Sequence, residues 1–404
     1  SVLEEIVNIR KALYIQNEDE DGDEEAYPDE YKLKKTTVLN NIYGVDLMGP
    51  AVEIAKLRCW LSVISELETD NIDELAEDNA LALPNVAFNL REGNSLIGYT
   101  GFPETTDDGE QYQIGKFSED SVRDRYQDII GEIEKYEQAP NSETAEKHQK
   151  RANERLQTAR KELIDDIHDD FVETGIENIT PDTIEDLEPF NWVLEFAEVY
   201  ADGGFDVVVG NPPWDRLRPT RDDFFMRYDE EFHSLPPEAK DERQAELLED
   251  EDIETAWEEY QHEIEIATTY FRESDAYRLQ EPTVGGRSQS TENDLSSLFF
   301  ERVFDLAKDG GYVAQVLPGT IFNGASTKDL RVQLLDETTI QSLITWENRD
   351  IFEAVDGRYN FGVVSFKNSG RTEELHGIFQ QHGLGIIEEF DQHSLSIPRK
   401  VLLN

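Results

Sequence analysis

The chain has 404 residues, of which 38% are hydrophobic, and this suits two to three domains of roughly 150 residues with buried cores. It has no apolar run long enough to span a membrane, no signal peptide and a single cysteine, Cys59, which excludes a disulfide framework and a cysteine-based zinc site; we expect a soluble, cytoplasmic protein. The net charge of −52 would ordinarily argue against nucleic acid, but the acidic residues are spread along the whole chain as in halophilic proteins, so charge does not decide the ligand.

The first predicted element is a helix over residues 1–16. It is followed by an acidic run, Asn17 to Glu30, which we interpret as a solvated loop. A calcium-binding loop is the alternative, but Gly22 is not followed by the rest of the EF-hand pattern. The seven histidines are scattered without a metal-binding pattern, so we predict no metal site.

Short β-branched or apolar runs recur along the rest of the chain. We predict strands over residues 41–46, 85–90, 205–210, 311–318, 342–347 and 361–366. Helices are predicted over 51–67 and 294–311, the second capped by Asp294 and ended by Gly310 and Gly311. Apolar strands that alternate with helices predict an α/β fold with a mostly parallel sheet covered on both faces.

Two long segments interrupt this alternation. Residues 101–204 are charged and have a helical pattern, which suggests an antiparallel helical hairpin. Residues 215–290 are polar, acidic and broken by Pro236-Pro237 and Gly285-Gly286. Both segments follow strands, so we expect them to leave the sheet at the edge where open α/β folds bind ligands.

The most specific motif is Asn211-Pro212-Pro213-Trp214, directly after the strand predicted over 205–210. A rigid turn that ends a strand is the alternative, since proline often stands there. Two prolines, however, also fix the backbone and remove two N–H donors, which leaves carbonyl oxygens as acceptors. Asn211 adds another acceptor and Trp214 adds a flat face. Such a set suits a planar ring that carries an amino group.

The exocyclic amine of adenine is a poor nucleophile because its lone pair is delocalised into the ring. The Asn211 side-chain oxygen and the Pro212 carbonyl would hold the two amine hydrogens and favour a tetrahedral nitrogen, which can attack a methyl group in line. A base inside a duplex cannot reach such a pocket. It would therefore be flipped out and stacked on Trp214.

The motif resembles the (Asn/Asp/Ser)-Pro-Pro-(Tyr/Phe/Trp) signature of methyltransferases that act on adenine N6, cytosine N4 or protein glutamine. The order of segments resembles the γ-class adenine-N6 DNA methyltransferases, more narrowly those of type IIG restriction-modification and related phage-defence systems. The resemblance covers roughly residues 40–100 and 200–370. It implies a Rossmann-like methyltransferase sheet with a large helical insertion, S-adenosylmethionine as cofactor and double-stranded DNA as substrate.

Two segments match the cofactor-binding parts of this family. Asp46 ends a predicted strand, and its carboxylate can accept both hydroxyls of a ribose. The resemblance assigns it the ribose of S-adenosylmethionine, and a helix-capping aspartate is the alternative. Asn94, Ser95 and Leu96 match the segment that contacts the cofactor adenine. Many relatives carry Asp in place of Asn94, but an amide can also accept from an amino group.

Two further features follow the motif. Phe352 matches the position of an aromatic side chain that packs against the flipped base, and ordinary core packing is the alternative. Arg216, Arg218 and Arg221 form a local basic cluster that would bind phosphates near that base. Surface ion pairs with Asp222, Asp223 or Asp229 are the alternative for these arginines.

The family's glycine-rich loop, which follows its first strand and wraps the methionine part of the cofactor, has no counterpart in residues 1–40. We therefore expect a fragment, or a missing N-terminal segment or partner subunit that supplies this loop. One rival is a protein-glutamine methyltransferase, although such enzymes are compact and lack two long insertions. The other is a catalytically silent subunit or fragment that binds DNA or serves assembly.

We expect the chain to be organised in four parts. They are an N-terminal part of the methyltransferase domain over 1–100, a helical insertion over 101–204, the catalytic part over 205–370 with its polar insertion 215–290, and the start of a C-terminal target-recognition region over 371–404.

Overall fold

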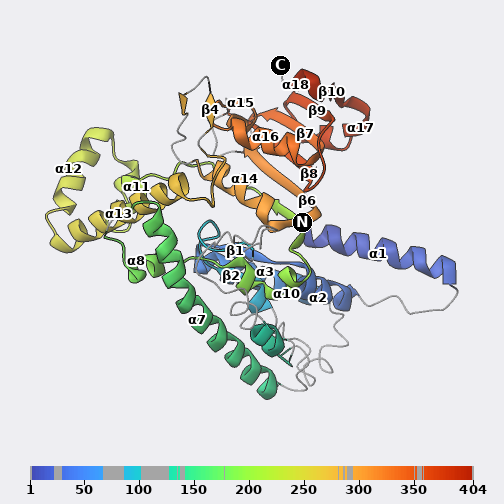
Figure 1. Ribbon diagram of the computed structural model, residues 1–404, viewed down its shortest axis with the longest axis horizontal. Coiled ribbons are helices and arrows are strands. Elements are labelled where there is room, and N and C mark those ends of the chain that lie inside the picture. The colour runs from blue at the N-terminus through green and yellow to red at the C-terminus, as the bar shows by residue number, and fades with distance from the viewer. Residues whose placement is uncertain are drawn as a thin grey trace, which may run out of the picture. The chain divides into compact units, whose positions relative to one another are not determined.

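A computed structural model gives the fold of the chain (Figure 1). The structure describes residues 2–21, 30–66, 86–101, 127–133, 135–136, 142–176, 178–280, 282–284, 287–288, 294–349, 351–352, 357 and 359–402. The chain divides into two compact units, one formed by Ser1–Ile167 with Ile184–Tyr200 and the other by His168–Thr183 with Ala201–Asn404. The four-part division expected from the sequence stays a prediction.

The first unit combines helices with a small parallel sheet. In chain order it begins with α1 (Val2–Asp21), α2 (Glu30–Asn41), β1 (Gly44–Asp46), α3 (Gly49–Ile64), α5 (Val86–Asn89) and β2 (Leu90–Glu92). Pro50 stands in the first turn of α3, where its missing N–H costs no hydrogen bond. β1 and β2 pair in parallel, so that Asp46 lies opposite Glu92 at the carboxyl end of both strands.

The rest of this unit is helical. Its elements are α7 (Ser142–Glu173) and α8 (Pro181–Asp186), which both cross the boundary between the units, then α9 (Trp192–Glu195) and α10 (Ala197–Ala201). Residues 127–133 are also helical, and they pack on α7 through ion pairs. Arg155 Nη1 lies 3.1 Å from Asp128 Oδ2, and His148 Nδ1 lies 2.9 Å from Glu132 Oε2. The helical content predicted between residues 101 and 204 is confirmed in the residues described.

The second unit contains a six-stranded mixed sheet. Its first elements are β3 (Phe205–Gly210), α11 (Arg221–Phe225), η2 (Phe232–Ser234), α12 (Pro237–Leu247), α13 (Glu251–Glu273), β4 (Thr283–Val284) and β5 (Arg287–Ser288). The remaining elements are α14 (Leu295–Leu306), β6 (Ala307–Pro318), α15 (Gly319–Asn323), α16 (Lys328–Asp336), β7 (Thr339–Glu347), β8 (Asn360–Lys367), β9 (Glu374–Gln381), η3 (Leu384–Ile387), α17 (Phe390–His393), β10 (Leu395–Pro398) and α18 (Arg399–Leu402).

The strand order of this sheet is β10-β9-β7-β8-β6-β3. β3 runs parallel to β6, whereas β8 is antiparallel to both of its neighbours, β6 and β7. The carboxyl ends of β3, β6 and β7 therefore lie at the same edge of the sheet. The register places Gly210 beside Gln315, and Phe361 beside both Pro318 and Trp346.

Apolar side chains pack on both faces of this sheet. On one face α14 and α16 contribute Phe300 and Leu330 to a cluster with Val364 of β8. On the other face Trp346 and Phe361 form a smaller cluster, against which partly buried side chains of η3 and α17 pack. This alternation along β8 follows from the two-residue period of a strand.

Helices α11 to α13 form a protruding part of the second unit with a core of their own (Figure 1). Phe224, Phe225 and Phe232 are buried there, and Trp257 and Tyr260 of α13 pack against them. Asp250 caps α13 by accepting a hydrogen bond from Asp252 N at 3.0 Å.

The predicted α/β class is confirmed, and so is the strand over 205–210. Three details of the prediction are wrong. The large sheet is mixed rather than mostly parallel, because β8 is inserted antiparallel between β6 and β7. Residues 86–89, predicted as strand, form the helical turn α5. The helix predicted over 294–311 ends at Leu306, although Asp294 does cap it by accepting from Ser296 N at 2.9 Å.

The acidic run from Asn17 begins as helix, because α1 extends to Asp21, and residues 22–29 lie outside the described part of the chain. Among the helices that the structure describes, none is long and apolar enough to cross a membrane.

Candidate functional site

The motif Asn211-Pro212-Pro213-Trp214 begins where β3 ends. Asn211 and Pro213 are exposed, Pro212 is buried and Trp214 is half-buried. The Asn211 amide is therefore open to a ligand, while the buried Pro212 ring fixes the backbone beside it. A Cβ on the preceding residue, Gly210, would lie 2.9 Å from Gln315 Oε1, so a larger residue there would have to displace the Gln315 amide.

The segment after the motif is tied to the start of α14. Leu295 N donates to the Asp215 carbonyl at 3.0 Å, and Arg216 forms an isolated antiparallel bridge with Asp294. Asp294 is the residue that caps α14. The end of the motif is thus held between the edge of the sheet and a helix terminus.

Trp214 and Phe352 contact each other, and both are partly buried against the cluster of Trp346 and Phe361. This agrees with the core-packing alternative for Phe352, and contact with a flipped base stays a prediction. The ring centroids of Trp214 and Phe352 lie 5.5 Å apart with planes at 80°. Phe361 of β8 contacts both rings, at 6.0 Å from Trp214 and 4.9 Å from Phe352. Trp346 stacks on Phe361 at 5.3 Å. We call these four residues the aromatic wall; it stands at the carboxyl edge of β3, β6 and β7.

The indole of Trp214 brings one polar group, its N–H, into this wall. Its Nε1 atom is buried and has no hydrogen-bond partner among the residues described. A buried donor without a partner costs roughly 1–3 kcal/mol. The wall therefore holds the indole by packing and not by a hydrogen bond.

The three arginines after the motif differ in their surroundings. Arg216 and Arg218 are exposed, and Arg221 is half-buried and donates to Asp241 of α12. Arg221 thus forms an ion pair, as the alternative proposed. Its partner, Asp241, lies further along the chain than the aspartates nearest to it in sequence. Binding of phosphate by Arg216 and Arg218 stays a prediction.

Asp46 lies at the end of β1 and is exposed. Its Oδ1 accepts a hydrogen bond from Met48 N at 2.8 Å, while Met48 is the residue at the N-cap of α3. Asp46 therefore shapes the turn into α3 without occupying the capping position. Lone pairs of the exposed carboxylate remain to accept hydrogen bonds from ribose hydroxyls.

The predicted adenine-contacting segment lies next to Asp46, since Gly93 N donates to the Asp46 carbonyl at 3.1 Å. Asn94 N donates to the Glu188 carbonyl at 2.7 Å, and Asn94 Oδ1 accepts from Leu96 N at 3.2 Å. Leu96 is buried and Ser95 is half-buried. The Asn94 side-chain oxygen is thus partly engaged in its own turn.

This segment fits closely against residues 190–192. The Ser95 carbonyl accepts from Trp192 Nε1 at 3.0 Å. Gly98 has a φ of +117°, and a Cβ there would lie 2.5 Å from the Phe190 carbonyl oxygen. Glycine is therefore required for this close approach.

Glu92 was not predicted as a site residue. It lies beside Asp46 in the parallel register, so two carboxylates end the two neighbouring strands. Burial, followed by the charge of Glu92, raises the pKa of Glu188 above its ordinary value. An acidic residue directly before Gly93, at the end of a second strand, is the sequence signal that would have identified Glu92. A groove of about 310 Å³ includes Glu92, Gly49, Lys56 and Arg160 in its lining.

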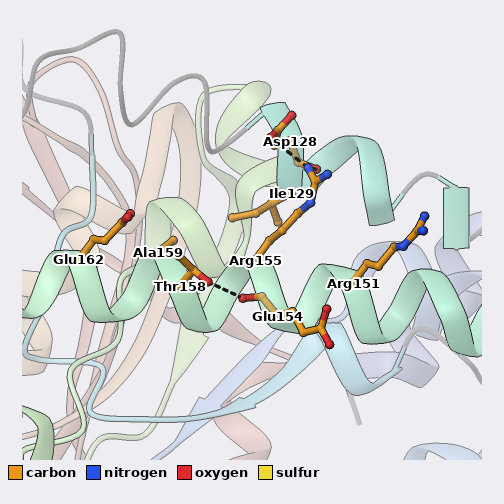
Figure 2. Close-up of a pocket in the computed structure, with 8 residues that line it drawn as sticks. All are labelled: Asp128, Ile129, Arg151, Glu154, Arg155, Thr158, Ala159 and Glu162. Atoms are coloured by element: carbon orange, nitrogen blue, oxygen red, sulfur yellow. Dashed lines mark hydrogen bonds and ion pairs between the residues drawn. The ribbon is translucent and has the colours of Figure 1, made fainter.

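A larger groove of about 710 Å³ runs along α7 (Figure 2). Arg155 points across it to Asp128, and the Thr158 hydroxyl donates to the Glu154 carbonyl at 2.9 Å. Arg151 and Glu162 complete a lining with both signs of charge, which favours no single class of ligand. In the described ranges no group of three or more histidine, cysteine or acidic residues is placed to hold a metal ion.

Comparison with known families gives one match that covers most of the chain. The sequence model of the Eco57I restriction-modification methylase family matches residues 40–241 and 260–352. The matched ranges include every predicted site residue from Asp46 to Phe352.

Individual proteins are similar over smaller parts. A protein of Methanocaldococcus jannaschii, whose name describes a type II restriction enzyme and methyltransferase, is 28% identical over 286 residues. The match covers 57% of this chain and 22% of that protein, so the chain spans about a fifth of the relative's length.

Two solved structures of type I restriction-modification proteins also match in part. One, from a study of assembly and conformational transition in a type I system, is 13% identical over 50% of this chain and 36% of its own, with a TM-score of 0.29. The other is a modification subunit from Vibrio vulnificus. It is 12% identical, the match covers 54% of this chain and 40% of that chain, and the TM-score is 0.28.

Proposed function

Because the chain belongs to the Eco57I restriction-modification methylase family, we propose that it is the catalytic part of an adenine-N6 DNA methyltransferase. Asn211 and Pro212 orient the target amine, and Trp214 and Phe352 bind the flipped adenine. The observation that carries this proposal is the exposed Asn211 amide at the end of β3. This end lies at the edge of the sheet where the aromatic wall also stands.

In the proposed reaction the Asn211 side-chain oxygen accepts one hydrogen of the adenine amine, and the Pro212 carbonyl accepts the other. These two hydrogen bonds draw the nitrogen lone pair out of the ring and aim it at the methyl group. The bound cofactor would supply the methyl group, its sulfur would keep the electron pair of the broken sulfur–methyl bond, and one amine proton would leave to solvent. Positioning and electrostatics supply the catalysis, so no strong general base is needed.

S-adenosylmethionine is the proposed cofactor, and when bound it supplies the electrophilic methyl group. The exposed Asp46 carboxylate has the acceptor chemistry that ribose hydroxyls require. Asn94 to Leu96 lie next to it through the hydrogen bond from Gly93 N to the Asp46 carbonyl. These residues fit a nucleoside and would hold that part of the cofactor, while Arg216 and Arg218 would bind DNA phosphates.

The decisive test is transfer of tritiated methyl from S-adenosylmethionine to unmethylated plasmid DNA in concentrated KCl. Asn211→Ala should lower the rate by roughly a hundredfold or more, because one of the two acceptors is lost. Gln341→Ala is the matched control, since Gln341 is an exposed amide at the opposite end of β7. Calorimetry should show unchanged cofactor binding in both variants.

The product decides the substrate class. Digestion to nucleosides and mass spectrometry should find N6-methyladenine. N4-methylcytosine, or label on a glutamine-containing protein in place of DNA, would overturn the adenine assignment. DNA binding without any transfer, unaffected by Asn211→Ala, would indicate a catalytically silent subunit.

A further inference from the structure

Asn348 directly follows β7 and is fully buried. Its Oδ1 accepts a hydrogen bond from Phe352 N at 2.8 Å, and its Nδ2 donates to the Phe352 carbonyl at 3.1 Å. One side-chain amide therefore takes up both hydrogen-bonding groups of the Phe352 backbone. It acts on Phe352 as a neighbouring strand would act on a paired residue.

The backbone of Asn348 is fixed in turn by the sheet. Asn348 N donates to the Tyr359 carbonyl at 2.8 Å, immediately before β8 begins at Asn360. Asn348 thus links the backbone N–H and carbonyl of Phe352 to the β7–β8 pair by hydrogen bonds. Because the aromatic wall includes Phe361 of β8, this link sets the Phe352 ring against the same strand that supports Trp214.

We infer that Asn348 is a positioning residue that sets the Phe352 ring against Trp214 and so shapes the surface that binds the target base. This role rests on the proposed function, because it assigns the wall to a base. Asn348 itself is fully buried and hydrogen-bonds the Phe352 backbone, so it acts through Phe352.

The sheet offers a matched control in Asn368. This asparagine directly follows β8, and its Nδ2 donates to the carbonyls of Phe304 at 2.9 Å and Ala307 at 2.7 Å. It thus makes two amide hydrogen bonds to backbone, as Asn348 does, but at the opposite edge of the sheet. Asn368→Ala should disturb the fold in a similar way without touching the aromatic wall.

The first experiment needs neither DNA nor cofactor. The full chain is labelled with 5-fluorotryptophan, and the Trp214 resonance among the five is identified by its loss in Trp214→Phe. In Asn348→Ala this resonance should shift or broaden, because the Phe352 edge no longer holds one position against the indole. The resonance of Trp257, which packs on Phe224 in the α11–α13 core, serves as the internal reference and should stay in place.

The second experiment measures methyl transfer with tritiated S-adenosylmethionine and unmethylated plasmid DNA. Asn348→Ala should lower kcat at least roughly tenfold and change the KM for S-adenosylmethionine by less than about threefold. Asn368→Ala should leave both constants close to those of the parent chain. If the parent chain itself transfers no methyl group, the proposed function fails, and the fluorine spectra still decide the role of Asn348.

A second variant covers the case in which Asn348→Ala does not fold. Asn348→Asp keeps an acceptor for Phe352 N but places a second oxygen against the Phe352 carbonyl. Protonation of that carboxyl restores a donor, so methyl transfer by this variant, relative to the parent, should recover as pH falls. A Trp214 resonance unchanged in both Asn348 variants, or shifted equally in Asn368→Ala, would overturn the inference.

Discussion

The indole of Trp214 combines a flat face with a buried N–H that has no partner in the described part of the chain. Trp214→Phe keeps a flat face and removes that donor. We expect its free energy of unfolding to stay within about 1 kcal/mol of the parent, because the lost packing is offset by removal of an unsatisfied group. Trp214→Ala removes the face as well and should cost roughly 2–4 kcal/mol.

Urea unfolding in concentrated KCl measures this difference, and the methyl-transfer assay separates stability from function. Trp214→Phe should remain active while Trp214→Ala loses most activity. A Trp214→Phe variant destabilised as strongly as Trp214→Ala would show that the indole N–H is satisfied in solution.

At the scale of elements, α14 carries a buried carboxylate that ties it to the chain before β4. Glu301 Oε1 accepts from Leu279 N at 2.9 Å, and Oε2 accepts from Gln280 Nε2 at 2.7 Å. Burial is the main cause that raises the pKa of Glu301 from 4.5 to about 7. Between these two values the unfolded chain has lost its proton at Glu301 and the folded chain has kept it.

The contribution of Glu301 to the free energy of unfolding is therefore full below about pH 4.5, falls as pH rises to about 7 and is constant above that. Glu301→Gln stays neutral, so its loss of stability between about pH 5 and pH 8 should be smaller than that of the parent by on the order of 2–3 kcal/mol. Urea unfolding at both pH values measures this. Glu388→Gln, at an exposed glutamate, is the control, and equal losses in all three proteins would refute the prediction.

The elements that the sequence predicts well are those whose signal is local. The run FDVVVG is rich in β-branched residues and forms β3 over the predicted residues, and the family resemblance drawn from Asn211 to Trp214 is confirmed by the family match. The short run over 85–90 has no period long enough to separate helix from strand, and residues 86–89 form α5. The antiparallel position of β8 depends on tertiary pairing, which no local pattern encodes.

The site shows the same division. Phe352 could be matched by its place before a predicted strand, and it does lie against Trp214. Asn348 could not be found, because a single buried amide that pairs with backbone leaves no pattern of spacing or charge. Glu92 was missed because the strand was predicted to end at residue 90, whereas β2 extends to Glu92.

At the scale of the whole molecule, the excess of 52 negative charges makes self-repulsion the dominant long-range force. Added salt shortens the screening length from about 10 Å at 0.1 M to about 3 Å at 1 M. We therefore expect the Tm to rise by roughly 10 °C or more between about 0.2 M and 2 M KCl. Sucrose at equal osmolality is the control, and an equal rise in sucrose, or a flat Tm in KCl, would contradict a charge effect.

The hydrogen bond between Leu295 N and the Asp215 carbonyl also bears on how this chain tolerates change in length. It joins the two ends of the segment that carries α11 to α13. Doubling the length of a closed loop costs only about 0.6 kcal/mol. The family match is interrupted between residues 241 and 260, inside this same segment. The stretch from α12 into the start of α13, where the family match is interrupted, is thus a place where chain can be added or trimmed while Asn211 to Trp214 stay fastened to α14.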